Sequence, residues 1–131
     1  MEIKEYKFDD EELIMLLRHH FGSDLHYREH NQHFHRAPTK TFFVATIGDK
    51  VVGYCSLNGK MIGDLSTIID FRGKGVASGL INYLQTREGI LTIGTSNEAL
   101  RRIVERLGFE FSHHRGKYKY YKWEAKDAIR G

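Results

Sequence analysis

The run Phe71-Arg72-Gly73-Lys74-Gly75 is the part of the sequence best suited to binding an anion. It follows a β-branched stretch and precedes apolar residues at helical spacing, so a glycine-rich turn leads directly into a helix. The first N–H groups of a helix have no acceptor within it, and the helix dipole is positive there. The glycines leave room for a ligand, and Arg72 and Lys74 add positive charge. A phosphate or pyrophosphate is therefore the expected ligand.

Two common phosphate-binding motifs do not match this turn. A P-loop requires Ser or Thr after Gly-Lys, whereas Gly73-Lys74 is followed by Gly75. A dinucleotide-binding fingerprint requires glycine where Ser78 stands, and it belongs to a parallel βαβ unit. The glycines alone also fit an ordinary tight turn with solvated basic side chains. The surrounding elements must decide between a turn and a site.

The elements before the turn are read from periodicity and turn residues. A strand is expected at residues 3–8, followed by a helix that Asp9 caps with Glu12 completing a capping box. Residues 23–40 have a weaker pattern, which favours a second short helix ending near Pro38. Three strands joined by hairpins follow at residues 41–47, 50–57 and 61–69.

The elements after the turn alternate between helices and strands. A helix is expected from about Gly75, a strand at residues 90–93, and a helix opened by Thr95 with Glu98. Strands at residues 109–111 and 118–123 complete the chain. The order β-α-α-β-β-β-α-β-α-β-β predicts an α+β fold, in which helices flank a mixed, mostly antiparallel sheet.

Length and composition indicate one globular domain over residues 1–131, with 40% hydrophobic and 28% charged residues. The single cysteine, Cys55, excludes an internal disulfide. No apolar run approaches the roughly 20 residues of a membrane span, and the first residues lack a secretory-signal pattern. A cytoplasmic location without a membrane partner is therefore expected. The net charge of +3 is too small to require nucleic acid, but it suits a polyanionic cofactor.

Three stretches resemble the GCN5-related N-acetyltransferases (GNAT), a superfamily that uses acetyl-CoA. Arg72, Gly75 and Ala77 match the signature Gln/Arg-x-x-Gly-x-Gly/Ala. Residues 67–75 resemble the end of the family's fourth strand and the loop after it. Ser96-Asn97-Glu98-Ala99 and Leu107-Gly108-Phe109 resemble the helix motif and the strand that follows. The resemblance extends from about residue 41 onward and implies a GNAT fold with acetyl-CoA as cosubstrate.

The resemblance also implies which residues hold the cosubstrate. The main-chain N–H groups that would bind the CoA pyrophosphate belong to Arg72, Gly73, Lys74, Gly75, Val76, Ala77 and Ser78. The pantetheine arm would pair with the main chain of Leu65 and Thr67, where the fourth and fifth strands diverge. Asn97 matches a side chain that contacts the arm, and the N–H of Thr67 is a candidate to stabilise an oxyanion.

Two positions depart from the family pattern. Many relatives carry a tyrosine that protonates the leaving thiolate where this chain has Val104, and a glutamate base where it has Thr92. Asp64 is the leading candidate to act as the base or to orient the acceptor, although a solvated carboxylate after Gly63 fits the sequence equally well. Cys55 has no feature that activates a thiol.

Other polar residues allow further interpretations. Tyr118, Tyr120 and Tyr121 are candidate acids, although strand aromatics more often serve packing. The interleaved bases and aromatics of residues 115–123 resemble a nucleic-acid surface, but they fit a half-buried edge strand protected by lysines better. The histidines of residues 23–40 lack a closed ligand set, so no metal is expected; they are His26, His30, His33 and His35.

Taken together, these features predict an N-acetyltransferase in which an amine attacks acetyl-CoA directly in a ternary complex. The acceptor is expected to be a small amine or a protein, and nucleic acid is not favoured as a partner. The sequence leaves a homodimer open. The alternative is a catalytically silent module of the same fold that binds CoA or nucleic acid, which the substitutions at Thr92 and Val104 motivate.

Overall fold

The computed structural model describes residues 1–21 and 39–126. The second helix predicted before Pro38 and the four histidines considered as metal ligands lie outside these residues. The elements, in chain order, are β1 (Glu2–Lys7), α1 (Glu11–Phe21), β2 (Lys40–Ile47), β3 (Lys50–Asn58), β4 (Met61–Thr67), the short 3₁₀ helix η1 (Ile69–Phe71), α3 (Val76–Arg87), β5 (Ile90–Thr95), α4 (Glu98–Arg106), β6 (Glu110–Arg115) and β7 (Tyr118–Glu124).

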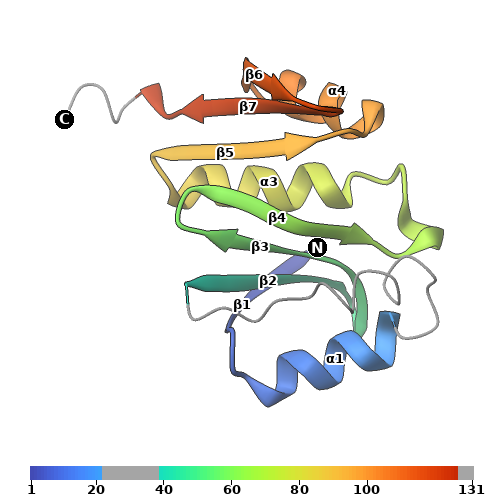
Figure 1. Ribbon diagram of the computed structural model, residues 1–131. Helices are drawn as coiled ribbons and strands as arrows, with labels where there is room; N and C mark the ends of the chain where they lie inside the picture. The colour runs from blue at the N-terminus through green and yellow to red at the C-terminus, as the bar shows by residue number, and fades with distance from the viewer. Residues whose placement is uncertain (22–38, 127–131) are drawn as a thin grey trace.

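The strands form one seven-stranded sheet in the order β1-β2-β3-β4-β5-β7-β6 (Figure 1). All neighbours are antiparallel except β4 and β5, which are parallel. The predicted α+β fold with a mixed, mostly antiparallel sheet is therefore confirmed. One expectation was wrong: β7 is not an edge strand, because it lies between β5 and β6. Local alternation reports which face a side chain occupies, not the position of its strand in a sheet.

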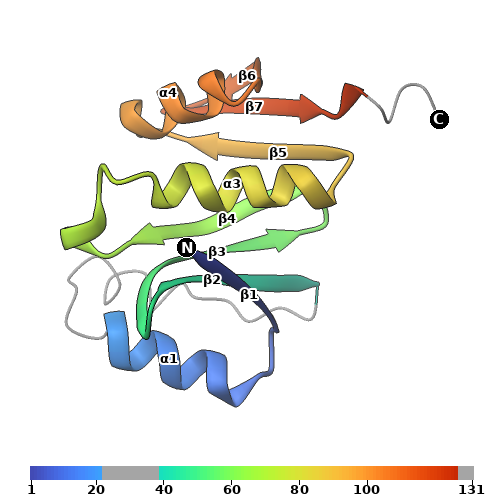
Figure 2. The same cartoon turned by 180° about the vertical axis from the view of Figure 1, so that it is seen from behind.

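The two faces of the sheet carry separate hydrophobic clusters. Helices α3 and α4 cover one face, which Figure 2 shows toward the viewer, and the buried side chains there include Leu80, Val104 and Ile93. Helix α1 covers the β1–β3 part of the other face through Leu13, which packs with Tyr54 in a second cluster. Within the described residues, no helix is long and apolar enough to cross a membrane.

The start of α1 differs from the prediction by one residue. The carboxylate of Asp10, not that of Asp9, accepts a hydrogen bond from the Glu12 N–H at 2.9 Å. Asp10 immediately precedes the first helical residue, which is the position from which a short side chain reaches the free N–H groups of the first turn. Glu12 instead forms an ion pair with Lys4 at 3.7 Å.

Close contact at Gly53 fixes the position of α3 on the sheet. A Cβ atom at this residue would lie 2.6 Å from Cγ1 of Val76 and 2.9 Å from the carbonyl oxygen of Ser66. Only glycine permits this approach. As a result, the first residue of α3 packs directly on β3, and the N-terminus of the helix lies beside the end of β4.

Candidate functional site

The glycine-rich turn presents an uncapped helix start. Gly73 and Gly75 have φ angles of +78° and +84°, which L-residues rarely adopt. Gly75 precedes α3, and no side chain caps the helix. The first main-chain hydrogen bond of the helix joins Gly79 N to Gly75 O at 2.9 Å, and Lys74 donates its N–H to the Phe71 carbonyl oxygen at 3.3 Å. The N–H groups of residues 76–78, which come before the first bond of the helix, are therefore left for a ligand. A Cβ built at either Gly73 or Gly75 meets no atom within 4 Å, so space is open there.

Three basic side chains surround this turn. Arg72 donates a hydrogen bond from Nε to the carbonyl oxygen of Thr67 at 3.2 Å. The ammonium groups of Lys50 and Lys74 lie 5.0 and 5.4 Å from the centroid of the Phe71 ring. In the described part of the chain, the lysines that pair with carboxylates are Lys4, Lys40 and Lys122. The charges of Lys50 and Lys74 are therefore left for an anionic ligand.

Lys50 is a functional candidate that sequence reasoning missed. It is the first residue of β3, and β3 runs antiparallel to β4. That topology brings the β2–β3 hairpin next to the turn that follows β4. The predicted hairpins contained the necessary information, because a hairpin between β3 and β4 places the start of β3 beside the end of β4.

We expect Lys50→Ala to weaken CoA binding about 2- to 5-fold, the usual size of an exposed charge interaction. Titration calorimetry at low and high salt measures the effect, which should shrink at high salt because exposed charges are screened. Lys60→Ala, in the hairpin at the other end of β3, is the matched control and should leave the affinity unchanged. Equal affinities for wild type and Lys50→Ala would remove Lys50 from the site.

Strands β4 and β5 pair over only two residue pairs. These are Met61 with Thr92 and Ile62 with Ile93. Beyond them the strands diverge toward their carboxyl ends, with α3 behind (Figure 1). We call this region, residues 63–67 of β4 and 94–95 of β5, the β4–β5 fork. It confirms the divergence of the fourth and fifth strands that the family resemblance implied.

The main chain of β4 turns hydrogen-bonding groups toward the fork, of which the Thr67 carbonyl oxygen already accepts one bond from Arg72. Ile68 donates its N–H to the Val52 carbonyl oxygen at 2.9 Å, so its polar groups point toward β3. Because successive residues of a strand point their N–H and C=O groups in opposite directions, those of Thr67 and Leu65 point toward the fork. An extended ligand lying in the fork can therefore pair with these two residues as an added strand.

A β-bulge places Asp64 at the fork. Gly63 pairs with Ser56 and Ser66 pairs with Tyr54, so Cys55 faces two residues of β4. Asp64 is the extra residue, with a φ of +49° that aspartate tolerates better than most residues. The main chain of β4 therefore changes direction at Asp64, just after the last residue that pairs with β5.

The Asp64 carboxylate is held by two partners that the sequence did not reveal. Its Oδ2 accepts hydrogen bonds from Ser56 Oγ at 2.7 Å and from Lys40 Nζ at 3.1 Å. The side chains of Lys40 and Asp64 are each only 16% exposed. Asp64 is thus a fixed, half-buried anion, and not the freely solvated carboxylate that was the alternative interpretation.

Of the three candidate tyrosines, Tyr120 contacts a fork residue. Its ring lies over Gly94, where a Cβ would be 2.5 Å from Cε1, and it stacks on His113 with centroids 4.8 Å apart. Tyr118 is 43% exposed and lies beyond the last residue that pairs β7 with β5. Tyr121 points toward α4 instead, and burial, together with the charge of Glu105, raises its pKa.

Asn97 caps α4, and this corrects the prediction that Thr95 opens the helix. The Asn97 side chain accepts a hydrogen bond from the Leu100 N–H at 3.0 Å, whereas Thr95 Oγ1 accepts one from the Asn97 N–H at 2.9 Å. Asn97 lines a cavity of about 70 Å³ at the end of β5. Its amide nitrogen remains available to a ligand because the cap uses only the oxygen.

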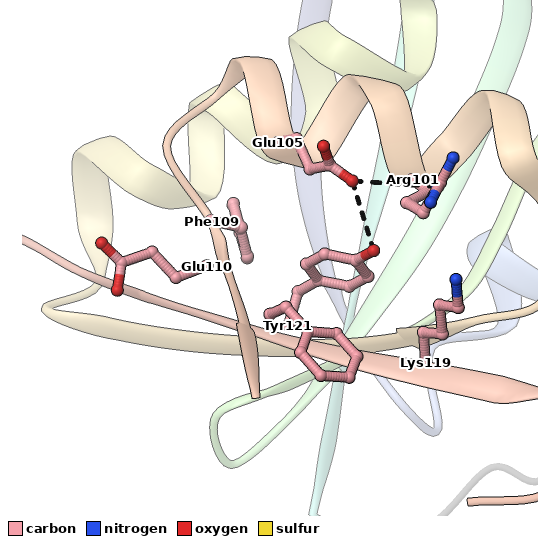
Figure 3. A pocket seen from close by; sticks show the side chains of 7 residues that line it. Arg101, Glu105, Phe109, Glu110, Lys119 and Tyr121 are labelled. Atoms are coloured by element: carbon pink, nitrogen blue, oxygen red, sulfur yellow. Dashed lines mark hydrogen bonds and ion pairs between the residues drawn. The ribbon is translucent and has the colours of Figure 1, made fainter. Parts of the chain in front are cut away.

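A larger cavity of about 560 Å³ lies between α4, β6 and β7 (Figure 3). The side chains that line it are Arg101, Glu105, Phe109, Glu110, Phe111, Lys119 and Tyr121. Figure 3 shows the Tyr121 hydroxyl and Arg101 both directed at Glu105. None of the residues predicted to bind the cofactor lies here, so this cavity is separate from the turn and the fork.

Comparison with known proteins decides the family. The profile of the acetyltransferase (GNAT) domain matches residues 38–111, which is more than half of the chain. The chain belongs to this family. A comparison with curated proteins found no match.

Solved structures show the same GNAT fold at low sequence identity. An acyl-CoA N-acyltransferase from Pseudomonas aeruginosa superposes with a TM-score of 0.68 at 12% identity, covering 92% of this chain and 97% of the other. The N-acetyltransferase PseH of Campylobacter jejuni gives 0.66 at 15% identity, covering 95% and 99%. An aminoglycoside 6'-N-acetyltransferase complexed with coenzyme A gives 0.66 at 13% identity, covering 95% and 97%.

Two positions of this GNAT domain carry no acid or base. Val104 is the completely buried residue of α4 and packs in the core. Thr92 donates its hydroxyl to the Lys60 carbonyl oxygen at 3.3 Å. Any proton transfer must therefore use other groups.

The single thiol of this GNAT domain is poorly suited to covalent chemistry. Cys55 is completely buried, and burial together with the nearby Asp64 charge raises its pKa to about 12. The reactive form of a cysteine is the thiolate, which is scarce at neutral pH under these conditions. The geometry therefore gives no support to an acyl-cysteine intermediate.

Proposed function

We propose that this GNAT domain is an acetyl-CoA-dependent N-acetyltransferase, in which an amine acceptor attacks the thioester directly in a ternary complex. The observation that supports it most is the joining of an uncapped helix start to the β4–β5 fork. The turn offers N–H groups and open space for a diphosphate, and the fork offers a main-chain edge for an extended arm. We further propose that residues 1–131 act as one domain in the cytoplasm.

The residues around the turn and fork fit acetyl-CoA. The N–H groups at the turn would hold the pyrophosphate, and they belong to Arg72, Gly73, Lys74, Gly75, Val76, Ala77 and Ser78. Leu65 and Thr67 would pair with the pantetheine arm, and the free amide nitrogen of Asn97 would contact it. When bound, acetyl-CoA supplies an acyl group activated as a thioester.

The proposed chemistry needs a neutral amine, a stabilised oxyanion and a proton for the departing thiolate. Asp64 would orient the acceptor's ammonium and take its proton, since its carboxylate already binds an ammonium in the structure. The Thr67 N–H would stabilise the oxyanion. Tyr120 is favoured over Tyr118 as the acid because its ring contacts Gly94 at the fork.

A silent CoA-binding or nucleic-acid-binding module is the second candidate, favoured by Val104 and Thr92. A homodimer stays compatible with the fold, since β6 is exposed along its length and carries Phe111, which is 55% exposed. Free-thiol release from acetyl-CoA, measured over small amines and lysine peptides, separates the two candidates. Binding of CoA without turnover across such a panel would favour the silent module.

Thermal unfolding in the presence of CoA tests the first requirement of the proposal, which is that the protein binds CoA. At a CoA concentration of 100 times Kd, we expect about 2.7 kcal/mol of added stability, which raises Tm by roughly 10 °C in a domain of this size. Adenosine at the same concentration is the control, because it lacks the diphosphate and the arm. An unchanged Tm with CoA would contradict both the enzyme and the CoA-binding module.

A further inference from the structure

The ion pair between Lys40 and Asp64 binds a primary amine of this chain to a residue of the β4–β5 fork. We propose that Lys40 is itself acetylated in cis by bound acetyl-CoA. The inference rests on the proposed function, because the acetyl donor is the one that the turn and fork would hold. The inference assigns a modification site to this chain. It also names the class of acceptor that Asp64 would accommodate, a lysine-type amine.

The Lys40 side chain reaches Asp64 across one strand, β3. Lys40 is the first residue of β2 and pairs with Asn58 of β3, whereas Asp64 lies on β4, beyond β3. Its Nζ lies 3.1 Å from Asp64 Oδ2, and Ser56 Oγ holds the same oxygen at 2.7 Å from the strand between them. Ser56 thus fixes the carboxylate from β3. The side chain of Lys40, whose ammonium binds this carboxylate, is only 16% exposed.

The other described lysines do not share this position. Lys4 pairs with Glu12 and Lys122 pairs with Glu124, and neither carboxylate belongs to the fork. In the described ranges, Lys40 is therefore the lysine whose ammonium is bound to a fork residue. An amine fixed beside an activated acyl group gains strongly in effective concentration.

The step balances without a further reactant. Asp64 accepts a proton from Nζ, and the nitrogen lone pair attacks the thioester carbonyl carbon. The C–N bond forms and the C–S bond breaks. The nitrogen gives its second proton to the departing CoA thiolate, and Asp64 releases the first proton to solvent. The products are N-acetyl-lysine at position 40 and free CoA. The neutral amide that results cannot pair with Asp64, so the carboxylate is left for another cation.

The test follows acetylation of the full chain with isotopically labelled acetyl-CoA, by intact mass and peptide mapping. Lys40 should be labelled at least about 10-fold faster than the exposed Lys60, with a rate independent of protein concentration. Chemical acetylation alone predicts the reverse order, because it favours exposed and unpaired amines. Lys40→Arg should remove the fast label while keeping an ion pair with Asp64 and a normal Tm.

Gly75→Glu separates enzymatic from chemical labelling, since loss of CoA binding should reduce Lys40 labelling to the rate of the exposed lysines. The inference is overturned if Lys40 is labelled no faster than Lys60, if its rate rises with protein concentration, or if Gly75→Glu leaves it unchanged. Failure of the proposed function is distinguishable, because a protein without acetyltransferase activity also releases no thiol from acetyl-CoA with the amine panel. A protein that turns over amines of the panel but labels Lys40 no faster than Lys60 refutes this inference alone.

Discussion

Gly75→Glu is expected to raise the Kd for CoA by more than about 100-fold, the largest effect of any single substitution considered. The new carboxylate would stand at the uncapped start of α3, where the proposal places the negatively charged pyrophosphate. The φ of +84° also strains any residue other than glycine. Titration calorimetry on the variant, after Tm confirms folding, gives the measurement.

Gly59→Glu is the matched control for this change. Gly59 also has a positive φ, +61°, and a Cβ there also meets nothing within 4 Å. It lies in the β3–β4 hairpin, away from the turn, so it carries the same charge and backbone strain without the predicted contact. Normal CoA affinity in Gly75→Glu, or an equal loss in Gly59→Glu, would remove the turn from the binding site.

Asp64→Asn is expected to lower kcat about 100-fold, in line with the loss of a positioned proton acceptor, while the Kd for acetyl-CoA changes less than about 3-fold. The amide retains an acceptor for Ser56, but it loses the charge that binds an ammonium and the basicity to take its proton. Steady-state thiol release and separate binding measurements distinguish rate from affinity.

Glu5→Gln is the control for the loss of charge at Asp64. Glu5 pairs with Arg87 at 3.0 Å and belongs to β1, at the edge of the sheet remote from the fork. This variant should retain full kcat. Wild-type activity of Asp64→Asn at every pH from 6 to 10 would exclude Asp64 from the mechanism, whereas a pH-dependent recovery at high pH fits the loss of a base.

The fold and the glycine-rich turn before α3 could be predicted because their signals are local. Glycines separate the periodic segments, and Gly73 and Gly75 occupy positions that need a positive φ. The cap of α1 was misplaced by one residue because Asp9 and Asp10 carry the same side chain, and only the helix geometry decides which one reaches an N–H.

The environment of Asp64 could not be predicted for a different reason. Lys40 and Asp64 are 24 residues apart, and they meet only because β2, β3 and β4 are paired in a register that shifts at the bulge. A shift of one residue moves a side chain to the opposite face, and no local pattern marks where it occurs. Lys50 differs in this respect, because the predicted hairpin between β3 and β4 already places the first residue of β3 beside the end of β4.

A structure of the chain with CoA bound is the sharpest test of the proposed binding site. We expect pyrophosphate oxygens at about 3 Å from N–H groups of residues 73–78, with the pantetheine arm along Leu65 and Thr67. CoA seated elsewhere, for example in the cavity beside Arg101 and Lys119, would contradict it.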